Sequence, residues 1–206
     1  MLLHKTLFGE AKEPMSTNTP IILGSGSPFR KDLLASTGLK FEVSVAKCDE
    51  KAILGSSPIK TAEARALAKA NAVSEEFPHA IVIGCDQVLS HQGEGMDKVL
   101  SESEAFDRLT QIQGDHHFLH SAYCLVKDSE KLIGRVVTIT MTMKELSSEE
   151  IREYVATGEW KGCVGCYQFE NKGGELFLKV DGTEDAIIGL PLKELLEDIN
   201  LVTSDD

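Results

Sequence analysis

Hydrophobic runs alternate with amphipathic segments along the first half of the chain. The runs at 20–24 and 80–84 are apolar almost throughout, a pattern typical of short buried strands. Residues 41–45 alternate as Phe-Glu-Val-Ser-Val, which predicts another strand. The intervening segments predict helices: one opens at Pro28 and ends near Gly38, and the alanine-rich segment 58–76 forms a longer one.

The second half is richer in β patterns. Residues 117–127 and 132–143 predict two long strands, and residues 175–180 a shorter one, while a glycine-broken loop is expected at 91–95. Helices are expected from 101 to 112, from 147 onward and from 191 to 199; the first two start with the capping-box pattern Ser-x-x-Glu. This order predicts an α/β fold with a mixed central sheet flanked by helices.

Length and targeting signals indicate how the chain is organised. Its 206 residues suit one domain, which we expect at 19–206, behind an N-terminal tail at 1–18 that is a tag, a disordered segment or an upstream start. No apolar run approaches the ~20 residues of a membrane span or the ~7–15 of a signal peptide. The odd number of cysteines, 5, fits a reducing compartment, so we expect a cytoplasmic protein without membrane contact.

The net charge of the chain limits the kinds of molecule that it is expected to bind. Lys and Arg together number 21 against 33 Asp and Glu, which gives a net charge of −12. Such an acidic chain is not expected to coat nucleic acid, which requires a basic face. A small anionic substrate remains compatible, because a few cations in one cleft can override the net charge.

The first candidate site is the turn Ser-Gly-Ser-Pro-Phe-Arg-Lys at 25–31. Ser27 can cap the helix that follows, and Pro28 suits its first turn. Small residues, two hydroxyls, two cations and a helix N-terminus together suit a phosphate. The same pattern also fits an ordinary capped helix with a solvated basic turn.

The second candidate is Asp86, which directly follows the run at 80–84. A carboxylate at the carboxyl end of a buried strand can hold a divalent metal or accept a proton from water. A turn-forming aspartate is the plainer alternative.

Two apparent metal motifs are weak. Cys163-x-x-Cys166 stands alone, without the further ligands of a structural zinc site, and ordinary core or loop cysteines are the better interpretation. His116 and His120 would lie about 13 Å apart on one face of a strand, with His117 on the other, too far apart for one ion.

Taken in order, these segments resemble the Maf family of nucleoside triphosphate pyrophosphatases over about 21–200. The resemblance rests on the opening Ser-Gly-Ser-Pro-Phe-Arg, on Lys69-Ala70, on Gly-Cys-Asp-Gln at 84–87 and on the closing Gly-Leu-Pro at 189–191. Two segments depart from the family pattern. Asp97-Lys98-Val99 stands where the family has Gly-Lys-Pro, which places an extra carboxylate beside Lys98, and Val164-Gly165 replaces Ala-Gly.

Three positions carry the substrate preference within this family. Members that act on dTTP and UTP have Arg, Thr and Gln there, whereas members that act on 7-methyl-GTP have an aromatic residue, Gln and Glu. This chain has Phe29, Gln87 and Glu170, so the resemblance implies a preference for 7-methyl-GTP. An aromatic face and a carboxylate suit the positive charge of the methylated base.

The resemblance also implies an inosine-triphosphatase-like fold with a substrate cleft, and hydrolysis between the α- and β-phosphates. We expect Asp86 to be the catalytic base, and Mg²⁺, Mn²⁺ or Co²⁺ to be held by Asp86 and Glu42. The residues expected to bind the substrate phosphates are Ser25, Ser27, Arg30, Lys69 and Lys98.

Alternatives remain open: a pyrophosphatase for dTTP, UTP or canonical nucleotides generally, or a regulatory protein that inhibits septum formation in cell division. A homodimer is a further expectation from the resemblance.

Overall fold

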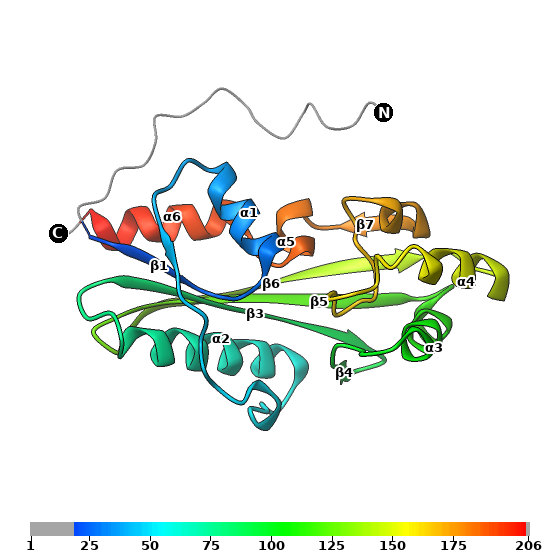
Figure 1. Ribbon diagram of the computed structural model, residues 1–206, viewed down its shortest axis with the longest axis horizontal. Coiled ribbons are helices and arrows are strands. Elements are labelled where there is room, and N and C mark those ends of the chain that lie inside the picture. The colour runs from blue at the N-terminus through cyan, green and yellow to red at the C-terminus, as the bar shows by residue number, and fades with distance from the viewer. Residues whose placement is uncertain (1–18, 205–206) are drawn as a thin grey trace.

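The computed structural model describes residues 19–204, which form one mixed sheet with helices on both faces (Figure 1). The expected α/β class with a central mixed sheet is therefore confirmed, whereas the tail predicted at 1–18 lies outside the described residues. The strands are β1 (Ile21–Gly24), β2 (Glu42–Val43), β3 (Ile81–His91), β4 (Glu94–Met96), β5 (His116–Lys127), β6 (Glu130–Met143) and β7 (Phe177–Asp181). The helices are α1 (Pro28–Ser36), α2 (Pro58–Ser74), α3 (Glu102–Ile112), α4 (Ser148–Ala156), α5 (Glu184–Ile188) and α6 (Leu192–Thr203), with 3₁₀ turns η1 (Glu50–Ala52) and η2 (Lys172–Leu176).

The sheet has parallel and antiparallel parts. Its strand order is β2-β1-β3-β5-β6-β7, and β4 pairs with β3 outside this path. β1 runs parallel to β2 and β3, and the remaining pairs are antiparallel. Parallel strands need a crossover connection. Helix α1 connects the neighbours β1 and β2, and α2 connects β2 to β3, which lies on the other side of β1.

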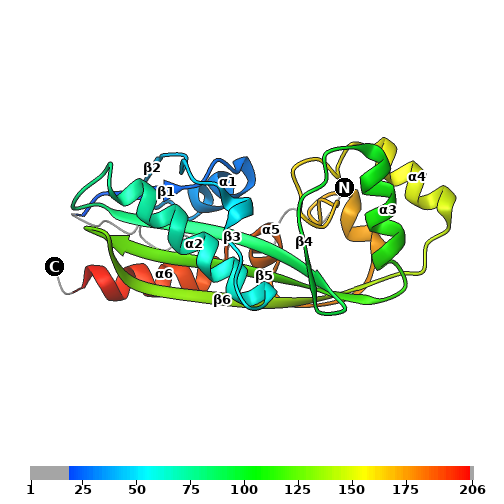
Figure 2. The same cartoon turned by 90° about the horizontal axis from the view of Figure 1, so that it is seen from below.

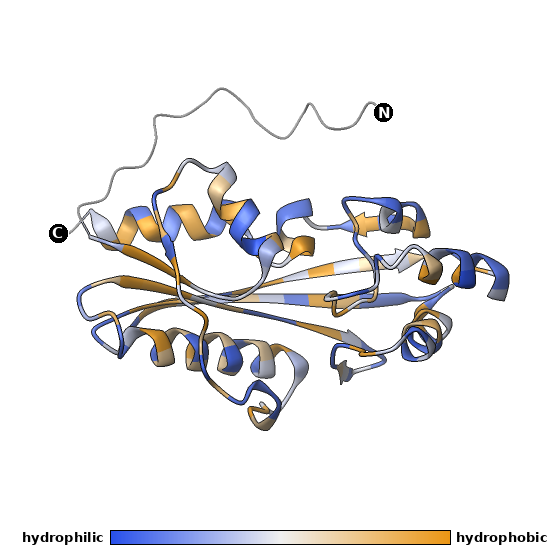
Figure 3. Ribbon diagram, viewed as in Figure 1, coloured by the Kyte–Doolittle hydropathy of each residue, from blue (hydrophilic) through white to orange (hydrophobic). Residues whose placement is uncertain are grey.

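Alternating side chains of β1 reach two separate cores. Ile21 and Leu23 pack with residues of α1 and α6, whereas Ile22 packs beneath α2 on the opposite face of the sheet. Figure 3 shows hydrophobic residues along these strands. A strand that is buried on both faces carries apolar side chains throughout, which explains the unbroken run in the sequence.

The long strands β3, β5 and β6 extend beyond α1, α2 and α6 into a second part of the molecule. We call the part built by β1, β2, α1, α2 and α6 the first lobe. The part built by β4, α3, α4, η2 and β7 is the second lobe (Figure 2). The second lobe has its own hydrophobic cluster, in which Leu109 of α3 and Ile151 of α4 pack against Met141 of β6.

Helix starts follow the predicted caps. Ser27 accepts a hydrogen bond from the Arg30 amide at the start of α1, and Pro28 follows it as expected. Both predicted capping boxes form, at the starts of α3 and α4. No helix within residues 19–204 is both long and apolar enough to span a membrane.

The main difference from the sequence prediction is the length of β3. The strand was expected to end at Gly84, followed by a loop at 91–95, but it continues to His91 and turns directly into β4. β5 pairs with it from Val82 to Ser90, so long-range pairing sustains the strand. Gln92 and Gly93 both have positive φ, 51° and 86°, which suits a tight two-residue hairpin turn.

Smaller differences concern the ends of other elements. β2 is two residues long instead of five, and β7 starts at Phe177 because the 3₁₀ turn η2 precedes it. The short helix α5 was not predicted.

Candidate functional site

The candidate site lies at a gap along one edge of β3. On this edge, β1 pairs with β3 up to Gly84, and β4 begins to pair at Leu89. Between these points no strand of the described chain pairs with this edge, and side chains replace it: Arg30 Nη1 and Lys69 Nζ donate to the Cys85 carbonyl at 3.3 and 3.4 Å. Asp86 and Gln87 therefore lie in mid-strand, which corrects the expectation of a strand-end aspartate.

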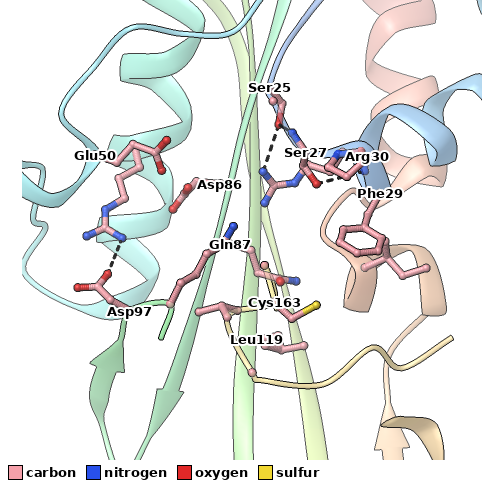
Figure 4. Close-up of a pocket in the computed structure, with 18 of the residues that line it drawn as sticks. Ser25, Ser27, Phe29, Arg30, Glu50, Asp86, Gln87, Asp97, Leu119 and Cys163 are labelled. Atoms are coloured by element: carbon pink, nitrogen blue, oxygen red, sulfur yellow. Dashed lines mark hydrogen bonds and ion pairs between the residues drawn. The ribbon is translucent and has the colours of Figure 1, made fainter. Parts of the chain in front are cut away.

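A cleft of about 800 Å³ opens at this gap, lined by residues of both lobes. All but one of the residues expected in the site line it; they are Ser25, Ser27, Phe29, Arg30, Lys69, Asp86, Gln87, Lys98 and Glu170. The exception is Glu42, which is exposed on β2 and pairs with Ile22 away from the cleft. Figure 4 shows several of these side chains together.

The turn before α1 forms one wall. The buried Ser25 hydroxyl accepts hydrogen bonds from the Ser27 amide at 3.3 Å and from Arg30 Nη1 at 3.5 Å. Arg30 Nε donates to the Gly189 carbonyl at 3.0 Å. Gly189 has a positive φ, 114°, and a Cβ there would lie 3.2 Å from Arg30 Nε. The closing Gly-Leu-Pro segment thus fixes the guanidinium at the base of the cleft.

A buried lysine joins two carboxylates on the opposite wall. Lys69 Nζ of α2 lies 2.6 Å from Asp86 Oδ1 and 2.8 Å from Glu50 Oε2. The contact is possible because α2 packs against the backbone of β3 at Gly84, where a Cβ would lie only 2.2 Å from the Ala66 carbonyl. Lys69 and Asp86 are both almost fully buried, so their charges are little screened by water.

Asp86 Oδ2 is buried, and no hydrogen-bond partner for it lies within the described residues. A buried carboxylate oxygen without a donor is costly, which suggests a ligand that is not part of the chain. Glu50 supplies a second carboxylate nearby, through Lys69. Sequence reasoning missed Glu50 and chose Glu42; the available signal was the acidic pair Asp49-Glu50, which forms a capped 3₁₀ turn after β2.

The Asp97-Lys98 segment enters the cleft from the second lobe. Burial at the cleft, followed by the charges of Arg30 and Lys69, lowers the pKa of Lys98 below its usual value. The neighbouring Asp97 carboxylate pairs with Arg65 of α2, with Asp97 Oδ1 3.2 Å from Arg65 Nη1. Arg65 was not among the residues expected from the sequence.

Gln87 has a fixed amide orientation. Its Nε2 donates to Ser121 Oγ at 2.8 Å and to the carbonyls of Ala186 and Ile187 at 3.2 and 2.9 Å. Two carbonyl acceptors can only be met by the amide nitrogen, so Oε1 is the end left for a ligand. The pKa of Glu170 is raised, first by burial and then by the charges of Glu184 and Glu159.

The histidines at 116–120 have partners of their own. His117 is buried against the Tyr167 hydroxyl at 2.7 Å, and burial lowers its pKa to about 3, so it is neutral. His120 bonds Ser90 at 2.8 Å. Across residues 19–204, no three His, Cys, Asp or Glu side chains gather closely enough to hold a metal ion by themselves.

Cys163 lines the cleft, but burial raises the pKa of its thiol to about 12, and Cys166 is buried with its pKa raised to about 11. Neither thiol is activated as a nucleophile.

Comparison with known proteins places the chain in a family. The family model described as Maf-like protein matches residues 20–201. The chain belongs to the Maf family. This confirms the resemblance drawn from the ordered sequence motifs.

Several curated relatives match along most of the chain. A 7-methyl-GTP pyrophosphatase of Bartonella quintana is 41% identical over 182 residues, which cover 85% of this chain and 92% of that protein. A 7-methyl-GTP pyrophosphatase of Mesorhizobium japonicum is 40% identical and covers 90% and 98%. A nucleoside triphosphate pyrophosphatase of a Ruegeria species is 36% identical and covers 89% and 96%.

Among solved structures, a nucleoside-triphosphatase / dITP/XTP pyrophosphatase of Mycobacterium abscessus aligns with a TM-score of 0.39 at 16% identity, over 62% of this chain and 75% of that one. A likeness this distant carries no argument about the site.

Proposed function

We propose that the protein hydrolyses a nucleoside triphosphate between the α- and β-phosphates, releasing a nucleoside monophosphate and pyrophosphate. One observation carries this proposal: Asp86, whose buried Oδ2 has no hydrogen-bond partner among residues 19–204, lines a cleft that also contains Arg30, Lys69 and Lys98. Curated Maf relatives named as pyrophosphatases support the same reaction.

The cationic side chains suit the phosphates. Arg30 and Lys69 both donate to the Cys85 carbonyl, so their charges meet at the gap in β3. The N-terminus of α1 adds amide donors, with Ser25 and Ser27 beside it. Lys98 contributes a third cation from the second lobe, across the cleft. Most of the rate would come from holding the phosphates in place and stabilising their developing charge.

Asp86 fits the role of general base. Its Oδ1 is held by Lys69, which leaves Oδ2 to accept a proton from the attacking water. The residues also fit a divalent cation such as Mg²⁺, Mn²⁺ or Co²⁺, because Asp86 and Glu50 offer two carboxylates and the phosphates can complete the oxygen shell. Such an ion, held by Asp86 and Glu50 instead of Glu42, would neutralise charge on the phosphates.

The remaining cleft residues favour 7-methylguanine. Gln87 presents an acceptor, its Oε1, and the Glu170 carboxylate is a second acceptor, so both suit the N1–H and 2-amino donors of guanine. Phe29, half-buried at the start of α1, offers an aromatic face to the positively charged base. Burial, followed by the charges of Glu184 and Glu159, raises the pKa of Glu170, and a positively charged methylated base beside it would favour the carboxylate form.

The compartment and partner expectations follow as proposals. The acidic chain and the proposed cationic cleft suit a small nucleotide and not a nucleic acid. The described cysteines are all free, which supports a reducing, cytoplasmic location.

A panel of triphosphates with a pyrophosphate readout tests the function. We expect kcat/KM for 7-methyl-GTP to exceed that for GTP, dTTP and UTP by about tenfold or more. Glu170→Gln should lower the ratio of 7-methyl-GTP to GTP, because it removes the negative charge that favours the cationic base. Glu153→Gln, an exposed residue of α4 outside the cleft, is the matched control.

A preference for dTTP or UTP would contradict the base assignment. A purified protein that hydrolyses no triphosphate with Mg²⁺, Mn²⁺ or Co²⁺ would contradict the activity itself and favour a binding role in cell division.

A further inference from the structure

Arg65 is a buried cation of the cleft to which the proposed mechanism gives no role. Its side chain is 9% exposed and lies on α2, one turn before Lys69. Nε donates to the Ile53 carbonyl at 3.1 Å, and Nη1 lies 3.2 Å from Asp97 Oδ1. Arg65 therefore connects α2 of the first lobe with the segment of the second lobe that carries Lys98. In Figure 4 a dashed line marks the contact at Asp97.

Asp97 is an unfavourable residue for an anionic substrate. It directly precedes Lys98 and lines the same cleft, and its side chain is 60% exposed. A free carboxylate there would compete with phosphate for the Lys98 ammonium and would repel the triphosphate. In the structure this carboxylate contacts Arg65 instead, at 3.2 Å from Nη1.

The backbone at Asp97 is held by a different residue. Arg108 of α3 donates from Nη2 to the Asp97 carbonyl at 3.0 Å and from Nη1 to the Val164 carbonyl at 3.1 Å. The segment thus has an anchor within its own lobe that does not need the Asp97 side chain. Because Arg108 already anchors this backbone from within the second lobe, a mechanical role for Arg65 is the weaker explanation.

We propose that Arg65 is a positioning residue that holds the Asp97 carboxylate away from Lys98 and the phosphates, and so leaves the Lys98 ammonium available to the substrate. This inference rests on the proposed function and deepens it, because it explains how the cleft accepts an aspartate next to a phosphate-binding lysine.

Rescue of one variant by a second tests the proposal. Arg65→Met should raise KM for the triphosphate by about tenfold, with a smaller change in kcat, because the released carboxylate pairs with Lys98. Asp97→Asn in the Arg65→Met background removes that charge at nearly constant shape, and KM should return to within about twofold of the wild type. Asp97→Asn alone should also stay within about twofold.

The alternatives predict different patterns. If Arg65 binds phosphate itself or acts only through stability, the double variant stays as impaired as Arg65→Met. If the ion pair works as a latch between the lobes, Asp97→Asn alone is as impaired as Arg65→Met. Either pattern overturns the proposal. Because the decisive comparison is made within the Arg65→Met background, any loss of stability from the buried substitution is common to both proteins.

Salt and a matched control separate charge from structure. Raising ionic strength from about 0.01 to 0.15 M shortens the Debye length from about 30 to 8 Å, so the Arg65→Met defect should shrink. A defect unchanged by salt would count against the proposal. Lys60→Met breaks the exposed Lys60–Glu63 pair on the same helix, outside the cleft, and should leave KM unchanged.

Direct binding distinguishes this inference from the proposed reaction. Calorimetry with inorganic pyrophosphate and Mg²⁺ should give the same order of dissociation constants among the variants. If the wild type hydrolyses no triphosphate but this order holds, the reaction is wrong and the Arg65 assignment stands. If the wild type fails to bind pyrophosphate, or the double variant binds no better than Arg65→Met, the assignment is wrong.

Discussion

Two adjacent residues of β3 have different proposed roles in the cleft, Asp86 in catalysis and Gln87 in recognition of the nucleobase. Asp86 and Gln87 project to opposite faces of the strand, because side chains alternate along it. Asp86 meets Lys69 of α2, and Gln87 meets the carbonyls of α5. At the gap in the sheet edge both side chains line the same cleft, which would place the proposed chemistry and the proposed base recognition one residue apart.

Asp86→Asn tests the catalytic assignment at this scale. Asparagine keeps the shape but cannot act as a base, so we expect kcat to fall by about 10²-fold or more. Lys69 keeps Glu50 as a partner, so the far-ultraviolet circular dichroism spectrum should be unchanged. Asp107→Asn, an exposed residue of α3, is the control. Release of pyrophosphate at nearly the wild-type rate would rule out Asp86 as the base.

The sequence predicted most of the residues that line the cleft, but it did not predict Glu50 or Arg65. The phosphate-binding turn has a local signal in its serines, proline and arginine, and its cap forms as predicted. Glu50 is marked only by its place in the acidic pair Asp49-Glu50, and Arg65 by no local pattern. Each reaches the cleft through the path of the chain, after β2 or along α2. Glu42, which was expected to hold the metal, lies on an exposed part of β2.

At the scale of elements, the close packing of α2 on β3 sets the site. The approach depends on Gly84, because a Cβ there would lie 2.2 Å from the Ala66 carbonyl and 2.5 Å from the Ala70 amide nitrogen. Both contacts are with helix backbone, which cannot rotate away. Gly84 therefore allows α2 to lie close enough to β3 for Lys69 to contact Asp86.

Gly84→Ala should reduce both stability and activity. We expect a loss of about 3 kcal/mol in the free energy of unfolding, from overpacking against backbone. The displaced helix should also lower kcat/KM. Gly95→Ala is the control, since its new methyl would have no neighbour closer than 3.6 Å. Urea denaturation and the pyrophosphate assay measure the two effects, and equal stability of the two variants would contradict the packing argument.

Local sequence patterns predicted some boundaries of helices and strands but not others. Capping boxes are local and predicted the starts of α3 and α4 correctly. The continuation of β3 past Gly84 depends on its pairing with β5, where Cys85 meets Tyr123 and Ser90 meets Phe118, so no local pattern marks it. The same long-range pairing moved Asp86 from a strand end to mid-strand.

At the scale of the whole molecule, two lobes share one sheet (Figure 2), and residues of both lobes line the cleft. The first lobe provides the turn at 25–30 and Lys69, the second provides Lys98 and Glu170, and the shared strand β3 provides Asp86. Each lobe packs around its own hydrophobic clusters. A bound triphosphate would touch both.

Hydrogen exchange tests that arrangement. A non-hydrolysable triphosphate analogue with Mg²⁺ should slow amide exchange at 25–30 and also at 97–100, although these segments belong to different lobes. The end of α6, which lies outside the cleft, serves as the internal reference. Protection limited to one lobe would mean that the ligand does not bridge the cleft.

The contact between Arg65 and Asp97 also imposes an order on mutational change. Arg65 already bonds the Ile53 carbonyl, so it has a partner whether residue 97 is charged or neutral. Asp97 without Arg65 would leave a carboxylate that pairs with Lys98 in place of the substrate. A laboratory lineage that starts with glycine at 97 can thus gain the arginine first and the aspartate second, whereas the reverse path passes through a handicapped intermediate. Arg65 is, in that sense, a permissive residue for Asp97.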